Sequence, residues 1–144
     1  MFDKLDNATP EAIKALNEKL GFTIPTQYES FLLTHGGGQP MNNFYRKYKD
    51  DKALWEFPVN DFFGLDNSGS DLFSVYCQYL GRIPKNLLPI GNDGIDNIIC
   101  IGVNDNTMGK IFICIHIDAI GEERFRVEFL ADSFEEFLSG LGED

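Results

Sequence analysis

The chain has 144 residues, of which 43% are hydrophobic and 13 are phenylalanine. A chain of this size and composition can fill one core, so we expect a single domain over residues 1–144 and exclude disorder over most of its length. The net charge of −11 also disfavours a nucleic-acid ligand, because phosphate binding requires a basic surface.

The negative charge belongs to the second half of the chain. Residues 1–52 carry seven acidic and seven basic side chains, whereas residues 53–117 carry seven against three and residues 118–144 carry nine against two. Such an acidic region can attract a basic protein partner, because opposite fields accelerate encounter. The alternative is that the charge only keeps the protein soluble.

The sequence shows no targeting or membrane signal. Residues 1–6 contain early carboxylates and no apolar run, and the longest apolar stretch, residues 111–117, is too short to span a bilayer. Cys77, Cys100 and Cys114 are odd in number and lack the spacings of a disulfide framework or a zinc site. We therefore expect a cytoplasmic protein without membrane contacts, in which these thiols are buried and reduced.

Two helices are predicted near the N-terminus. Thr9 is suited to cap the first helix, Pro10 to its first turn, and Gly21 to its end. The second helix is expected from about residue 25 to residue 34. The three glycines at 36–38 stop it abruptly, and they suit a close approach of another backbone segment.

The middle of the chain gives weaker signals. Residues 42–48 could form a strand and residues 49–52 a solvated loop, while residues 55–59 and 62–65 carry strand-type side chains around a proline. Ser70 is suited to cap a third helix. The side chains that we expect to face inward from this helix are Leu72, Val75, Tyr76, Tyr79 and Leu80.

Short strands dominate the second half. Residues 98–103 and 111–117 are apolar runs around a polar loop and predict an antiparallel hairpin, and residues 124–129 alternate like a half-buried strand. Ser133 and Glu136 form a capping box for a final helix. Its apolar face is expected to contain Phe134, Phe137, Leu138 and Leu141. The whole pattern predicts an α+β fold with a central, mainly antiparallel β-sheet flanked by helices.

A search for catalytic chemistry finds no signature. Neither His35 nor His116 neighbours a Ser, Cys or Asp in a known catalytic spacing. Asp93, Asp96 and Asp105 lack the alternate positions and the closing Glu of a calcium loop, and the glycine triplet lacks the Lys-Ser/Thr of a phosphate loop. We therefore expect a binding protein with no catalytic residues, no metal and no cofactor, although an enzyme of unrecognised type stays an alternative.

Several motifs occur together in a distinctive order. Leu-Gly-Phe-Thr-Ile-Pro at 20–25 precedes Phe-Phe-Gly-Leu at 62–65 and Ile-Pro-Lys-Asn-Leu-Leu-Pro-Ile-Gly-Asn-Asp-Gly at 83–94, and Ala-Asp-Ser-Phe-Glu-Glu-Phe-Leu follows at 131–138. Together they resemble the SUKH superfamily, the Smi/Knr-like proteins, over about residues 13 to 141. Gly94-Ile95-Asp96 departs from the Gly-Gly-Asp-like turn that the family often shows.

The resemblance implies a SUKH (Smi/Knr-like) fold and a protein partner. Bacterial members commonly act as immunity proteins that bind and neutralise a secreted toxin, often a nuclease, whereas fungal members act in signalling and cell-wall regulation. Our leading hypothesis is an immunity protein that contacts a cognate toxin through an acidic surface. The alternative is an intracellular regulatory or scaffold module that binds an endogenous partner. Oligomeric state stays open.

The candidate contact residues are carboxylates on turns and loops, with aromatic side chains as anchors. The carboxylates are Asp61, Asp66, Asp93, Asp96 and Asp105, and the aromatic candidates are Tyr45 and Trp55.

Overall fold

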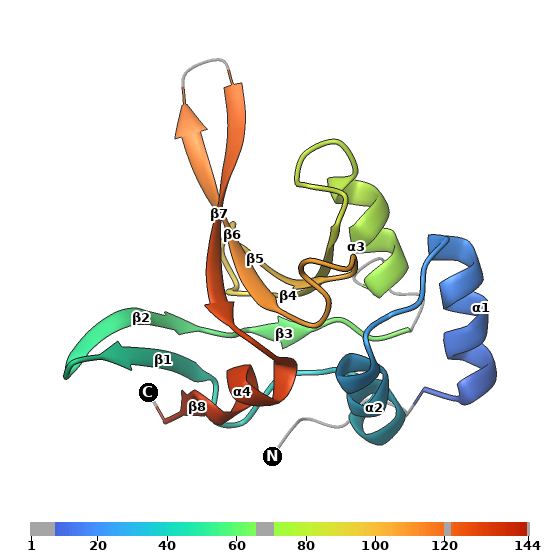
Figure 1. The fold of residues 1–144 in the computed structure, drawn as a ribbon, viewed down its shortest axis with the longest axis horizontal. Helices are drawn as coiled ribbons and strands as arrows, with labels where there is room; N and C mark the ends of the chain where they lie inside the picture. The colour runs from blue at the N-terminus through green and yellow to red at the C-terminus, as the bar shows by residue number, and fades with distance from the viewer. Residues whose placement is uncertain (1–7, 66–70, 120–121, 144) are drawn as a thin grey trace.

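The computed structural model describes residues 8–65, 71–119 and 122–143, and Figure 1 shows how its helices and strands are arranged. In chain order the helices are α1 (Pro10–Leu20), α2 (Thr26–His35), α3 (Leu72–Tyr79) and α4 (Phe134–Ser139). The strands are β1 (Phe44–Lys49), β2 (Lys52–Pro58), β3 (Asp61–Phe62), β4 (Leu87–Asn92), β5 (Ile98–Gly102), β6 (Ile111–Ala119), β7 (Glu122–Ala131) and β8 (Leu141–Gly142).

The strands of the described residues form two sheets. Five strands lie in the order β3-β4-β5-β6-β7, and a smaller sheet has the order β2-β1-β8. Each pair of neighbouring strands within these sheets is antiparallel. The predicted α+β fold is therefore confirmed. Its strands divide between two sheets, and β8 completes the smaller one beside β1, where Leu141 pairs with Tyr45.

Strand β5 lies at the centre of the larger sheet, and all of its residues are buried. Its odd-numbered side chains, such as Ile99, belong to the main core, which the helices cover. Its even-numbered side chains face a smaller apolar cluster on the opposite side of the sheet. That smaller cluster contains Ile83, Leu87, Ile98, Cys100 and Cys114. A strand buried on both faces explains the continuous apolar run at this point of the sequence.

Aromatic rings join helices α2 and α4 to both sheets. The Phe31 ring of α2 lies 5.4 Å from that of Phe62 in β3 and 5.2 Å from that of Phe134 in α4, both edge to face. On the next turn of α4, Phe137 stacks on Tyr45 of β1 at 4.5 Å. Edge-to-face and offset pairs of this kind add about 0.5–1.5 kcal/mol each beyond the burial of their area. Helix α4 thus packs against both sheets, through Phe134 on Phe62 and through Phe137 on Tyr45.

The hydroxyl of Tyr28 fastens helix α2 to the larger sheet. This side chain is fully buried. Its hydroxyl donates to the carbonyl oxygens of Phe63 at 2.6 Å and Ile90 at 3.2 Å. Burial, and to a smaller extent the negative charge of Asp61, raises the pKa of the Tyr28 phenol well above its usual value. The phenol therefore stays protonated and able to donate at any physiological pH.

The glycine triplet after α2 acts as a helix stop and a close backbone contact, as predicted. Gly36 ends the helix in the left-handed region with φ of 74°. Gly38 and Phe62 exchange two backbone hydrogen bonds of 2.9 Å. At Gly37, where φ is 102°, an added Cβ would lie 2.9 Å from the backbone of Gly64 and Phe62. No side chain fits there, so glycine is required.

Most local predictions are confirmed. Thr9 caps α1 by accepting from the Ala12 amide at 3.1 Å, and Gly21 ends that helix with φ of 82°. The β5–β6 hairpin is antiparallel. Ser133 caps α4 as expected, since its hydroxyl accepts from the Glu136 amide at 3.0 Å, whereas the Glu136 carboxylate accepts from the Asp132 amide instead of the Ser133 amide of an ideal capping box.

Four details differ from the sequence-based expectations, and three of them, at Leu80, Leu141 and Cys77, were wrong. One refines the predicted solvated loop at residues 49–52: all four are exposed, but Lys49 and Lys52 belong to strands, and Asp50 and Asp51, with φ of 52° and 64°, close a tight β1–β2 hairpin. Leu80 lies beyond the end of α3 and is 49% exposed. Leu141 belongs to β8 instead of the last helix, and Cys77 is exposed while the other two thiols are buried.

The predicted capping residue of the third helix, Ser70, lies outside the described residues. The described structure caps α3 at Asp71, whose carboxylate accepts from the Ser74 amide at 3.2 Å. Aspartate and serine are both preferred at this position, because each has a short side chain with an acceptor oxygen.

Replacing Tyr28 with phenylalanine tests the link between α2 and the larger sheet. Tyr28→Phe keeps the ring but leaves the Phe63 carbonyl without its hydroxyl donor, so we expect unfolding to require about 1–3 kcal/mol less free energy. Urea unfolding at constant m-value measures the change. Tyr48→Phe removes a hydroxyl from a side chain that is 58% exposed and should stay within about 0.5 kcal/mol of the parent. Equal stability of both variants would contradict the assignment.

Candidate protein-binding surface

Three of the predicted contact residues lie at one end of the larger sheet. Asp61 of β3 pairs with Asn92 of β4, and Asp93 and Asp96 follow in the turn that joins β4 to β5. Asp105 follows the opposite end of β5 and therefore does not share this surface. The structure thus brings the first three carboxylates together and separates the fourth. Asp66 lies outside the described residues.

The turn at residues 92–97 is held by its own polar side chains. The Asp93 carboxylate accepts from the amides of Ile95 at 2.9 Å and Asn97 at 3.2 Å, and from the Asn97 side-chain nitrogen at 2.7 Å. The Asn92 side-chain oxygen accepts from the Gly94 amide at 3.0 Å. Each bond satisfies a backbone or amide donor within the turn, so the turn is ordered without any partner.

The same turn is anchored to the neighbouring strands. The Asn97 side-chain oxygen accepts from the backbone amide of His116 in β6 at 3.0 Å. On the other side, Gly94 has φ of 83°, and a Cβ there would lie 3.2 Å from the side chain of Asn60. The turn is therefore held between β6 and the residue that precedes β3.

Asp93 and Asp96 consequently have different roles. Asp93 is only 6% exposed, and both of its carboxylate oxygens accept hydrogen bonds within the turn. Its carboxylate therefore stabilises the turn and is not accessible to a partner. Asp96 is exposed, and beside it Ile95 is 79% exposed, which places an apolar side chain next to a carboxylate at the tip of the turn. We call Ile95, Asp96 and Asp61 the turn surface. Asp61 belongs to it because it pairs with Asn92, at the start of the turn.

A hollow of about 280 Å³ adjoins the turn surface. One wall comes from α3, where Gln78 and Tyr79 line it, and another from Ile95 itself. The remaining lining residues are Asn60, Phe63, Val75, Asn92, Gly94 and Ile98. The lining combines amide side chains with the apolar side chains of Phe63, Val75 and Ile98, so it offers polar and apolar groups to a partner.

The two predicted aromatic anchors lie elsewhere, in the smaller sheet. Tyr45 is 3% exposed, and its hydroxyl donates to the Leu130 carbonyl at 3.4 Å. Burial, followed by the nearby charge of Glu136, raises the pKa of Tyr45 to about 12. Trp55 is half-buried and meets Phe57 edge to face at 6.3 Å. Tyr45 therefore holds the two sheets together and does not reach the surface.

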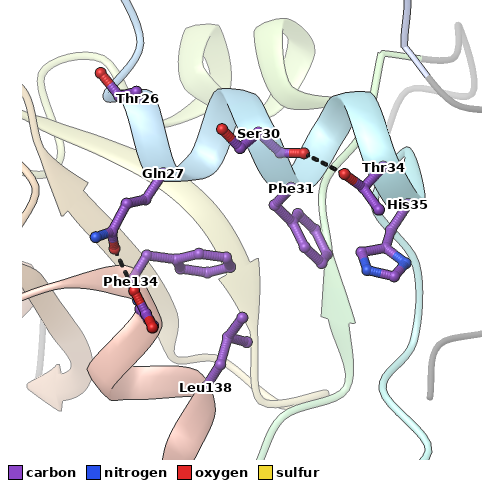
Figure 2. A pocket seen from close by; sticks show the side chains of 9 residues that line it. Thr26, Gln27, Ser30, Phe31, Thr34, His35, Phe134 and Leu138 are labelled. Carbon is purple, nitrogen blue, oxygen red and sulfur yellow. Dashed lines mark hydrogen bonds between the residues drawn. The ribbon is translucent and has the colours of Figure 1, made fainter.

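A second hollow, of about 390 Å³, lies between α2 and α4 (Figure 2). Phe31, Phe134 and Leu138 form its apolar walls, with the His35 ring 5.4 Å from that of Phe31. The Gln27 side-chain oxygen accepts from the Glu135 amide at 2.8 Å, and so joins the two helices across the mouth. Sequence reasoning missed this hollow, because it arises from the packing of segments more than a hundred residues apart. Polar side chains complete the lining: Thr26, Gln27, Ser30, Thr34, His35 and Glu135.

The described residues offer no constellation of metal ligands. Within residues 8–65, 71–119 and 122–143, no three His, Cys, Asp or Glu side chains gather closely enough to hold an ion. In the same part of the chain, no helix has the length and apolar character needed to cross a membrane. Cys100 and Cys114 approach with their sulfur atoms 3.8 Å apart in the smaller cluster, where burial raises the pKa of the Cys100 thiol.

The described residues form a small α+β protein with an ordered, exposed turn at one end of its larger sheet. The chain belongs to the SMI1 / KNR4 family (SUKH-1), whose sequence pattern matches residues 7–140. It is also similar to the SPbeta prophage-derived uncharacterized protein YokK of Bacillus subtilis (strain 168). The two are 29% identical over 147 aligned residues, which cover 92% of this chain and 74% of that relative. The family resemblance expected from the sequence is thereby confirmed.

Replacing the two turn carboxylates separately tests their different roles. Asp93→Ala removes the acceptor for three donors within the turn, so we expect a loss of about 1–3 kcal/mol in unfolding free energy. Asp96→Ala removes an exposed carboxylate and should change stability by less than about 0.5 kcal/mol. Thermal and urea unfolding of both variants measure the difference. A stability loss at Asp96 that equals the loss at Asp93 is the contrary result.

Proposed function

We propose that this protein is an immunity protein that binds a cognate secreted toxin, a nuclease, and neutralises it by direct contact at the turn surface. The observation that carries the proposal is the turn itself, in which Ile95 is 79% exposed beside Asp96 on a loop held by Asp93. Membership of the SUKH-1 family supports the class of function, because that family includes toxin-immunity proteins.

The order of the turn favours tight binding. A flexible loop loses conformational freedom when it binds, whereas a loop already fixed by hydrogen bonds loses little. The backbone amides of Ile95 and Asn97 both donate to Asp93, and the adjoining hollow offers a complementary recess. The side chains that contribute most binding energy at an interface become packed in a desolvated pocket within a ring of contacts that excludes water, and this is the role that we assign to Ile95.

The charge distribution favours a basic partner. Residues 53–144 contain sixteen acidic side chains and five basic ones, and the turn surface lies within this part of the chain. A nuclease presents basic side chains to the phosphates of its substrate, so an acidic protein is drawn to the same surface and covers it. Occupation of that surface prevents the substrate from entering, with no chemistry required of the immunity protein.

Co-expression with the toxin domain encoded by the neighbouring gene tests the function. We expect cells that produce the toxin to survive only when this protein is present, and the two proteins to elute together from a sizing column. A catalytically inactive toxin should bind equally well, since binding does not depend on turnover. Cells that die as readily with this protein as without it, together with separate elution, would overturn the proposal and leave the regulatory alternative.

Variants matched in charge test the binding surface. Asp96→Lys and Asp105→Lys change the net charge equally but lie at opposite ends of β5. At low salt we expect Asp96→Lys to slow association with the toxin roughly tenfold, and Asp105→Lys to slow it less than about twofold. Ile95→Ala should mainly accelerate dissociation, with a loss of about 2 kcal/mol in binding free energy. Surface plasmon resonance at several salt concentrations measures both rates. Equal effects at Asp96 and Asp105 would reject the turn surface.

A further inference from the structure

Strand β7 forms one edge of the larger sheet. Among the described strands it pairs only with β6, and it is the longest strand of the fold at ten residues. Figure 1 shows the β6–β7 hairpin rising past the ends of the other strands. A long edge strand offers unpaired backbone groups to any other strand, and proteins normally cover or disrupt such an edge.

Hydrogen bonds of the neighbouring strands show which residues of β7 direct their backbone N–H and C=O groups away from β6. The His116 amide donates toward β5, to the side chain of Asn97, and the Gly102 amide donates to the Lys110 carbonyl. Along a strand, the N–H and C=O groups of every second residue point to the same side. His116 and Cys114 therefore both direct their N–H and C=O groups toward β5. Their partners across the ladder are Phe125 and Val127, which must therefore direct their amide and carbonyl groups outward, away from β6.

The sequence at this edge is self-complementary. Residues 125–129 are Phe-Arg-Val-Glu-Phe, which is symmetric about Val127 except that arginine on one side corresponds to glutamate on the other. In an antiparallel pair of two copies centred on Val127, Arg126 lies opposite Glu128 and Phe125 lies opposite Phe129. Opposite charges and apolar groups that face each other across strands both stabilise a sheet.

The side chains at this edge are exposed and already oriented. Arg126 and Glu128 form an ion pair of 3.1 Å within the strand, and both remain largely accessible. On the other face, Val127 is 37% exposed and Phe129 is 42% exposed. The Phe129 ring is held edge to face against Phe112 at 5.9 Å. A second copy would continue this apolar stripe across the paired strands, where side chains from the two copies lie next to each other.

The pairing has a natural end. The register of β6 and β7 shifts between Ile111 and Phe112, which leaves Leu130 as an extra residue on β7. Its carbonyl accepts from the side chains of Lys47 and Tyr45, which come from β1. A bulge with its carbonyl already bonded cannot continue the ladder, so the free edge is limited to the symmetric segment.

We propose that this protein forms a homodimer with twofold symmetry through antiparallel pairing of β7 about Val127. The two five-stranded sheets become one continuous sheet. Two Arg126–Glu128 pairs cross the interface, and the phenylalanine side chains form one stripe along it. This interaction needs no toxin, so it stands or falls separately from the proposed function. The interface is small, and the dimer is expected to dissociate on dilution.

Charge exchange between the two copies provides the test. Sedimentation equilibrium of the full chain, from about 1 µM to about 1 mM, should show a reversible monomer–dimer equilibrium for the parent protein. Arg126→Glu places Glu opposite Glu128, and Glu128→Arg places Arg opposite Arg126. We expect each variant alone to dimerise at least about tenfold more weakly. A mixture of the two restores both opposite-charge pairs and should form the heterodimer, as should the double variant Arg126→Glu/Glu128→Arg with itself.

The mixture also serves as the control for folding, because two misfolded variants would not recover association when combined. The internal Arg126–Glu128 ion pair is exposed, so its loss alone has little effect on stability. A parent protein that stays monomeric over the whole concentration range overturns the proposal, as would single variants that dimerise like the parent. A mixture that associates no better than its separate components contradicts it as well.

Discussion

The hydroxyl of Tyr28 is the interaction on which the arrangement of the turn surface depends. It reaches from α2 to the carbonyls of Phe63 and Ile90, which belong to segments 35 and 62 residues away along the chain. Phe63 follows β3 directly and Ile90 lies within β4, so the two hydrogen bonds fix these strands relative to α2. Asp61 and the 92–97 turn extend from those strands. A single buried donor therefore connects the core to the surface that is proposed to bind the toxin.

Local sequence signals predicted the elements well and their assembly less well. The caps of α1 and α4 and the β5–β6 hairpin depend on residues close together in the chain, and all were predicted correctly. The third strand of the smaller sheet depends on Tyr45 pairing with Leu141, a contact across most of the chain that no periodicity reveals. A loop was predicted at residues 49–52, but not its tight hairpin turn, because the two aspartates adopt positive φ without a glycine to indicate it.

The candidate site shows why residue type alone does not identify a contact. Asp93 and Asp96 are equivalent in the sequence, yet one accepts three hydrogen bonds and the other is exposed. Asp93 lies two residues before Ile95, whose turn amide needs an acceptor, and this position distinguishes it from Asp96. Ile95 was visible only as a departure from the family's usual turn, although an isoleucine inside a polar turn has no local role. Tyr45 is an aromatic residue of the type that often anchors an interface, but it is buried against Phe137 of α4.

The central claim is that the toxin covers the turn at residues 92–97 and the adjoining start of β3. Hydrogen–deuterium exchange of this protein, free and bound to the toxin, tests it most directly. We predict slower exchange in peptides covering residues 92–98 and 59–62 on binding, with residues 103–110 unchanged at the opposite end of β5. Protection confined to residues 103–110, or to the groove between α2 and α4, with none at the turn, would contradict the account.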